Sequence, residues 1–244
     1  MVDSPNLARS LDARNEEDRD GRDFWLWWVA ATSVGVVLGV VVSAMIEVAI
    51  AESWYRVAMP RSEELLKSIL GFGVAVSMFG AFVGTIQWTV LRWRLNRAGW
   101  WAPATVAGWS LAGMVGRGLS AAFQDLTSAG GVGSPVDLAV NLIPFILLPG
   151  VCQWLVLRRQ VNAAGRWLWG SAGALLVAFV AAGTVVEKGL VSAGWLLPED
   201  LSSVKASVFF GLVIGPIYGA ITGVVMVRLR QREVAAAAET GVPS

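Results

Sequence analysis

Apolar residues gather into six long runs along this chain, and short polar segments separate them. A helix needs roughly 20 residues to cross a hydrocarbon core about 30 Å thick, because it rises about 1.5 Å per residue. All six runs reach that length, at residues of about 24–51, 65–91, 100–123, 136–157, 167–191 and 204–227. The pattern predicts an all-α integral membrane protein with six transmembrane helices.

The polar segments outside these runs define the expected domains. Residues 1–23 carry four arginines and seven acidic residues, without the apolar core and cleavage site of a signal peptide. We expect a mobile cytoplasmic segment at 1–23, a transmembrane domain at 24–228 and a cytoplasmic tail at 229–244. The six runs pair into three helical hairpins, at about 24–92, 100–158 and 167–228.

Basic residues set the expected orientation, because Lys and Arg in short loops stay on the cytoplasmic side of a membrane. Thirteen arginines lie before the first run, after the last run, or in the connections after the second and fourth runs. Only Arg56, Arg61, Lys67 and Lys205 lie near the opposite helix ends. We therefore expect both termini in the cytoplasm.

Tryptophan follows the same distribution. An indole at a helix end keeps its ring in lipid and its N–H among the headgroups, so such residues are usually interfacial anchors. A stacking platform for a ligand is the alternative interpretation. Ten of the 13 tryptophans lie near the helix ends expected in the cytoplasm: Trp25, Trp27, Trp28, Trp88, Trp93, Trp100, Trp101, Trp154, Trp167 and Trp169.

The chain contains an internal repeat. Residues 84–101 read GTIQWTVLRWRLNRAGWW, and residues 150–167, sixty-six positions later, read GVCQWLVLRRQVNAAGRW, with ten of eighteen positions identical. A more divergent third copy follows Gly219, and Trp25-Leu26-Trp27 matches Trp167-Leu168-Trp169 at the start of a hairpin. Repeats of fixed period indicate stacked structural units. We expect three parallel hairpins around a pseudo-threefold axis along the membrane normal.

The repeated block resembles a group of multi-pass bacterial membrane proteins. In that group Gly-x-x-Gln-Trp-x-x-Leu-Arg recurs, followed by a short linker, Ala-Gly and Trp, as at 84–101 and 150–167 here. The third copy departs from the pattern because it lacks Gln-Trp. The resemblance implies a multi-pass protein of the bacterial cytoplasmic (inner) membrane. It implies no activity, so it assigns no functional residue.

Small residues recur every four positions on several predicted helices. Apolar helices in lipid have no hydrophobic drive to associate, and close backbone approach along such stripes supplies van der Waals contact instead. The stripes predict tight helix packing, within one chain or between copies. They include Gly35 and Gly39, Gly80 and Gly84, and Gly211, Gly215, Gly219 and Gly223.

Few ionisable groups lie inside the apolar runs: Glu47, Arg117, Glu187 and Lys188. Ionisable residues inside membrane helices often mark ion or proton paths. These four, however, lie roughly 24 to 33 Å from the cytoplasmic helix ends, close to the outer interface. They are candidates for outer-side ion pairs between hairpins or headgroup contacts, and a polar outer vestibule is the alternative.

Gln87 and Gln153 occupy the same position in the two strong repeats, and Thr222 replaces them in the third. One interpretation is a polar path along the axis. The other is a set of interhelical hydrogen bonds, which are worth about 0.6 to 2 kcal/mol each in membranes. The three residues are candidates for both.

Composition argues against several functions. The chain has no histidine, one cysteine and a net charge of +1, and it lacks nucleotide-binding and serine-hydrolase motifs. We expect no enzyme activity, no cofactor, no metal and no nucleic-acid partner. Two hypotheses remain: a non-enzymatic scaffold, accessory or assembly subunit whose partners are the bilayer and other membrane subunits or itself, or a small-solute or ion transporter or channel.

Overall fold

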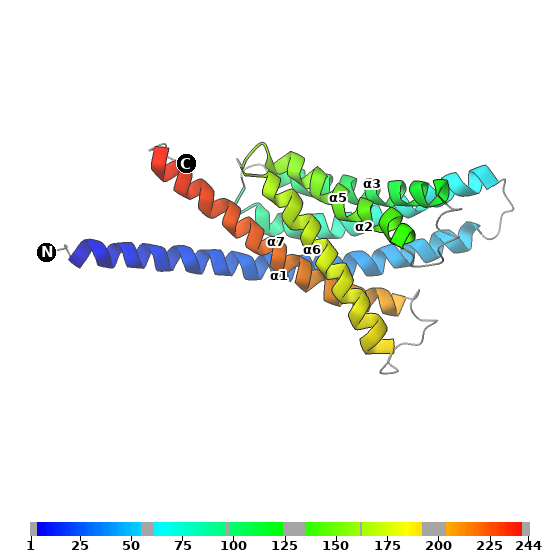
Figure 1. Cartoon of the computed structure of the whole chain (residues 1–244), viewed down its shortest axis with the longest axis horizontal. Coiled ribbons are helices and arrows are strands. Elements are labelled where there is room, and N and C mark those ends of the chain that lie inside the picture. Colours follow the sequence, from blue (N-terminus) through cyan, green and yellow to red (C-terminus); the bar gives the residue numbers. More distant parts are fainter. Residues whose placement is uncertain are drawn as a thin grey trace.

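The structure is a computed structural model that describes residues 4–54, 61–95, 98–123, 135–161, 163–191 and 204–240. Within these ranges all regular secondary structure is helical, with turns at 92–94, 158–160 and 163–164 (Figure 1). The connection between α2 and α3 includes the short 3₁₀ segment η1 (Ala98–Trp100), and α6 continues into the π-helical segment η2 (Val185–Val191). The α-helices are α1 (Ser4–Trp54), α2 (Arg61–Leu91), α3 (Trp101–Ala122), α5 (Pro135–Leu157), α6 (Gly165–Thr184) and α7 (Val204–Thr240).

Five of these helices are long and apolar enough to cross a membrane, which confirms the prediction of an all-α, multi-pass type of fold. The candidate spans are Arg19–Ile50, Glu63–Leu91, Ala139–Leu157, Gly165–Thr184 and Lys205–Arg232. The sixth predicted run, 100–123, forms α3, with 22 residues. It contains Arg117 and is not among the candidate spans. A sixth span therefore stays a prediction.

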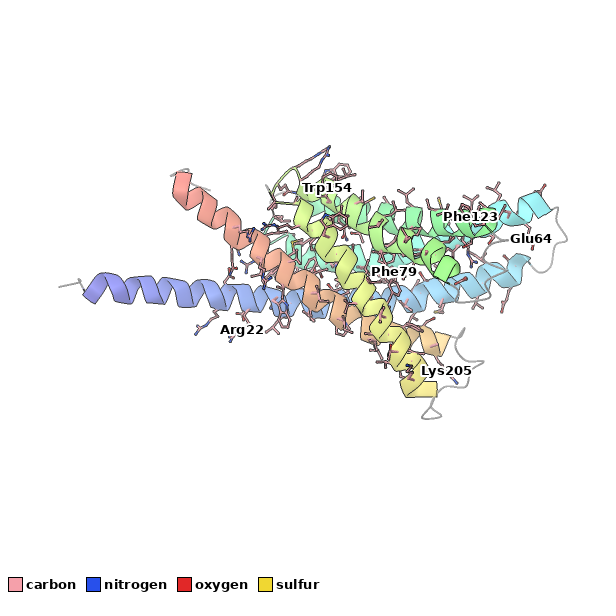
Figure 2. The ribbon with its side chains drawn as sticks, in the orientation of Figure 1. Arg22, Glu64, Phe79, Phe123, Trp154 and Lys205 are labelled. Carbon is pink, nitrogen blue, oxygen red and sulfur yellow. The ribbon has the colours of Figure 1, made fainter. Side chains whose placement is uncertain are left out.

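The helices form a closed ring in which each packs against the next: α1 against α2, then α3, α5, α6, α7 and back to α1. The N-terminal part of α1 and the C-terminal part of α7 lie at the same end of the bundle (Figure 1). We call this the terminal end, and it also carries Arg22 and Trp154; Glu64 and Phe123 lie at the opposite, distal end (Figure 2).

Helix α1 starts well before the first apolar run. It is continuous from Ser4, so the segment 1–23, expected to be mobile, is helical wherever the structure describes it. Asp20 in this segment contacts Arg94 in the turn after α2 and Arg230 on α7, as described below. The predicted hairpin bounds at 92, 100 and 158 lie within one residue of helix ends, but α7 continues to Thr240 and includes most of the predicted tail at 229–244.

Glycines bring neighbouring helices into backbone contact. A Cβ added at Gly35 on α1 would lie 3.0 Å from the Cα of Val83 on α2, and one added at Gly80 would lie 3.0 Å from the Cα of Val106 on α3. At Gly215 on α7 the added Cβ would lie only 2.7 Å from a Cα of α1. The stripes therefore lie at helix interfaces inside one chain, where van der Waals contact holds the ring together.

Candidate functional site

Three tryptophans meet at the axis of the bundle near its terminal end. Trp28 on α1, Trp101 on α3 and Trp167 on α6 are each fully buried. Their ring centroids are 5.3 to 6.2 Å apart, with the rings edge to face in all three pairs. We call these three residues the tryptophan cluster. The interfacial-anchor prediction is wrong for them, whereas Trp93 and Trp169 are largely exposed, as that prediction requires.

Each indole of the tryptophan cluster donates a hydrogen bond to a polar side chain of the neighbouring helical hairpin. Trp101 Nε1 donates to Gln87 Oε1 at 3.0 Å, and Trp167 Nε1 donates to Gln153 Oε1 at 3.2 Å. Trp28 Nε1 donates to Thr222 Oγ1 at 3.0 Å, closing the circle from α1 to α7. The three candidate path residues are thus the three acceptors for the indoles.

The two glutamines also bond within their own hairpins. Gln87 Nε2 donates to Thr32 Oγ1 at 3.1 Å, and Gln153 Nε2 donates to Thr105 Oγ1 at 3.0 Å. Both threonines come four residues after a tryptophan of the cluster, so they lie one turn further along the same helix face. In each case the amide joins the two helices of one hairpin to the tryptophan of the next.

The third hairpin reaches a similar result with different residues. Thr222 has no amide, and its hydroxyl donates to the backbone carbonyl of Tyr218 at 2.6 Å. Tyr218, one turn earlier on α7, places its hydroxyl 3.3 Å from Ser171 Oγ. Ser171 comes four residues after Trp167, as Thr32 and Thr105 follow their tryptophans. In the third hairpin a tyrosine therefore bridges the two helices, as a glutamine does in each of the other two hairpins.

Every buried side-chain polar atom in the described part of the chain has a hydrogen-bond partner. Gln87, Gln153, Thr222, Thr32, Thr105 and Ser171 are all at most 1% exposed. Unpaired polar groups at this depth would be costly, because neither lipid nor an apolar core offers a partner. The polar groups at the axis are therefore engaged with one another and are not turned toward an open path.

Three glycines pack in equivalent ways around the same level. An added Cβ at Gly84 would touch Thr105 and Ala102, one at Gly219 would touch Thr32 and Val29, and one at Gly150 would touch Ser171 and Leu168. In each case the contacts lie one and four residues after a tryptophan of the cluster. Residue 28, not residue 25, therefore makes the contacts of Trp101 and Trp167, which corrects the predicted alignment of the first hairpin by three positions. Trp25 instead donates to the carbonyl of Ala220 at 2.9 Å.

Cavities lie on both sides of the tryptophan cluster. The terminal cavity, of about 430 Å³, is lined by Leu91, Leu157 and Met226 and has a charged rim. The axial cavity, of about 220 Å³ and further toward the distal end, is lined by Val83 and Tyr218 among mostly apolar side chains, with Glu47 at its edge. The two linings share no residue, and along α2 the bond of Gln87 to the tryptophan cluster falls between Val83 and Leu91.

The predicted outer-side ionisable residues come together only in part. Arg117 Nη2 lies 3.5 Å from Glu47 Oε1, and its guanidinium lies 4.5 Å from the ring centre of Phe72. Both charged side chains are about half exposed, so their pairing is weak. Lys188 on η2 is exposed, and the side chain of Glu187 lies outside those the structure describes. A second ion-pair group stands at the terminal end, where Asp20 contacts both Arg94 and Arg230.

Sequence reasoning did not single out the hydroxyl residues that pair with the glutamines or, in the third hairpin, with each other. Thr32, Thr105, Ser171 and Tyr218 are ordinary residues of apolar helices, and their role depends on which helix faces which. The available signal was a hydroxyl residue four positions after a tryptophan, which occurs once at the start of each hairpin. Within the described residues no cluster of side chains is suited to hold a metal ion.

Comparison of the chain with protein-family models, with curated proteins and with solved structures finds no match.

Proposed function

We propose that this chain is a non-enzymatic scaffold, accessory or assembly subunit of a bacterial cytoplasmic membrane. In this proposal it crosses the bilayer six times as three hairpins around a pseudo-threefold axis, with both termini in the cytoplasm. The observation that carries the proposal is the closed axis: three interlocked indoles whose N–H groups all bond inside the protein.

The hydrogen bonds and glycine contacts support the threefold arrangement. The same set of contacts recurs at α2–α3, α5–α6 and α7–α1, each running from one hairpin to the next around the ring. Such a circle of contacts fits a unit that was copied twice and then diverged most in the third copy. Since α3 lies between α2 and α5 in the ring, it crosses the bilayer with them in this proposal.

The position of the tryptophan cluster supports a structural role for the axis. One face of α2 carries a residue at each level, four positions apart. Val83 lines the axial cavity, Gln87 bonds the tryptophan cluster, and Leu91 lines the terminal cavity. At about 1.5 Å per residue the closed layer between Val83 and Leu91 is roughly 12 Å thick. A solute crossing it would have to part the three indole rings and break their hydrogen bonds.

The proposal is tested in two ways with the full chain. Purified protein in phosphatidylcholine vesicles should leave their permeability to protons, K⁺ and glycerol at the level of protein-free vesicles. A photo-crosslinking amino acid at exposed Val180 on α6 should trap one discrete protein adduct in native membranes, and the same group at buried Val36 should trap none. Saturable flux of a solute, or crosslinks to lipid alone, would contradict the scaffold proposal.

A transporter is the second candidate, and the pair of cavities favours it. Spaces on both sides of a closed layer are what an occluded transporter needs, and the tryptophan cluster would then be its gate. Single cysteines at positions 83 and 91 in a Cys152→Ser background separate the two proposals. In a transporter, an impermeant thiol reagent should label each cysteine from both sides of the membrane. In a scaffold, the reagent should label neither cysteine from the side that lies across the tryptophan cluster.

A further inference from the structure

The terminal cavity combines an apolar interior with a cationic rim. Its volume of about 430 Å³ lies within the usual range of about 300–1,000 Å³ for small-molecule sites. Leu91, Leu157 and Met226 line the interior and belong to the same buried cluster as Trp28, Trp101 and Trp167. The rim is formed by Asp20, Arg94 and Arg230.

The rim holds two guanidinium groups on one carboxylate. Arg94 donates to both carboxylate oxygens of Asp20 and, at 3.3 Å, to its backbone carbonyl; Arg230 Nη1 lies 3.1 Å from Asp20 Oδ2. Arg94 comes from the turn after α2 and Arg230 from α7, so the carboxylate joins three separate parts of the fold. The Arg94 side chain is 19% exposed, and its guanidinium lies 5.4 Å from the ring centre of Phe24 inside the cavity lining.

The charge of the rim and the apolar interior of the cavity together restrict which kind of ligand would bind there. The three rim groups sum to one positive charge, and Arg presents planar paired donors that suit carboxylate and phosphate oxygens. Asp20 occupies the place that a bound anion would take. An apolar molecule alone would leave the rim unused, and a cation would meet two arginines. An anion carrying one apolar tail satisfies both parts of the cavity.

We propose that the terminal cavity binds a single-tailed anionic amphiphile, such as a fatty-acid anion or a lysophospholipid. Its head group lies on Arg94 and Arg230 in place of the Asp20 carboxylate, and its tail lies against Leu91, Leu157 and Met226. The proposal is independent of whether the protein is a scaffold or a transporter, because the cavity and its rim lie on the terminal side of the tryptophan cluster.

The test measures binding of radiolabelled dodecanoate to the full chain in nanodiscs of neutral phosphatidylcholine. Arg94→Gln and Arg230→Gln should each weaken binding about tenfold through loss of charge-assisted hydrogen bonds. Asp20→Asn should strengthen binding several-fold, since the competing carboxylate is gone. Arg92→Gln is the matched control, because Arg92 is an exposed arginine of the same turn that lies over Trp88 and outside the cavity. Dodecanol, which lacks the charge, should compete poorly and should not respond to Arg94→Gln.

Equal binding by the Arg94→Gln and Arg92→Gln variants would overturn the proposal, and so would unchanged or weaker binding by Asp20→Asn. The Asp20 variant keeps the test decisive if loss of Arg94 disturbs folding, which thermal unfolding of each variant reports. Replacing part of the nanodisc lipid with phosphatidylglycerol should displace little dodecanoate. Full displacement would assign the rim to ordinary two-tailed headgroups and would refute a single-tail site.

Discussion

Gln87→Leu tests whether the hydrogen bonds at the axis stabilise the fold. The substitution keeps a similar volume and removes two bonds, from Trp101 Nε1 at 3.0 Å and to Thr32 Oγ1 at 3.1 Å. Double-mutant cycles in membrane proteins average about 0.6 kcal/mol per side-chain hydrogen bond, so the two bonds amount to about 1.2 kcal/mol. The fully buried Trp101 N–H also loses its acceptor, and an unsatisfied buried group costs about 1–3 kcal/mol. We expect a total loss of about 2–4 kcal/mol.

A double-mutant cycle isolates the indole–amide bond. Trp101→Phe removes the indole N–H and keeps an aromatic ring. In the double variant with Gln87→Leu, no buried indole N–H is therefore left without an acceptor. The double variant should therefore lose less stability than the sum of the single variants, by about 1–2 kcal/mol, as is usual for residues in contact. Reversible unfolding in mixed micelles with increasing SDS, followed by far-ultraviolet circular dichroism, supplies the free energies.

Strict additivity of the two substitutions would refute the reasoning, because it would mean that the bond between Gln87 and Trp101 contributes nothing beyond each side chain alone. A Gln87→Leu variant as stable as the wild type would refute it as well. Gln153→Leu provides an internal replicate, since its two bonds, to Thr105 and from Trp167, have nearly the same lengths.

Two further predictions concern packing and surface charge. Gly108→Ala should destabilise the protein by about 1–3 kcal/mol, because the added Cβ would lie 2.6 Å from the Cα of Pro149. Gly173→Ala, whose added Cβ would have no atom within 4 Å, should be neutral or should stabilise the protein by about 0.5–1 kcal/mol. The same SDS unfolding measurement compares the two variants. Arg117→Gln should lower stability by no more than about 1 kcal/mol, and addition of 0.5 M NaCl to the wild type should reproduce most of that loss, since the ion pair with Glu47 is half exposed.

Local periodicity accounts for what the sequence could predict. Five of the six predicted spans correspond to helices of sufficient length and apolarity, because each is encoded by its own stretch of residues. The glycine stripes could be read in the same way, since residues four apart share one face of a helix whatever lies opposite. The terminal arginines and the repeated Gln87 and Gln153 were likewise visible as patterns. None of these features required knowledge of which helices are neighbours.

Only the tertiary structure decided which tryptophans face inward. In a water-soluble protein the buried face of a helix is apolar and the exposed face is polar, but in a bilayer the lipid-facing and core-facing sides are both apolar. Trp28 and its neighbour Trp27 therefore look alike in sequence, although Trp28 is fully buried and Trp27 is 63% exposed. The partners of Gln87 and Asp20 were hidden for the same reason, because Trp101 and Arg230 reach them from other parts of the ring. The sequence determined the helices and their close-packing faces, and the closing of the ring determined which polar groups meet at its axis.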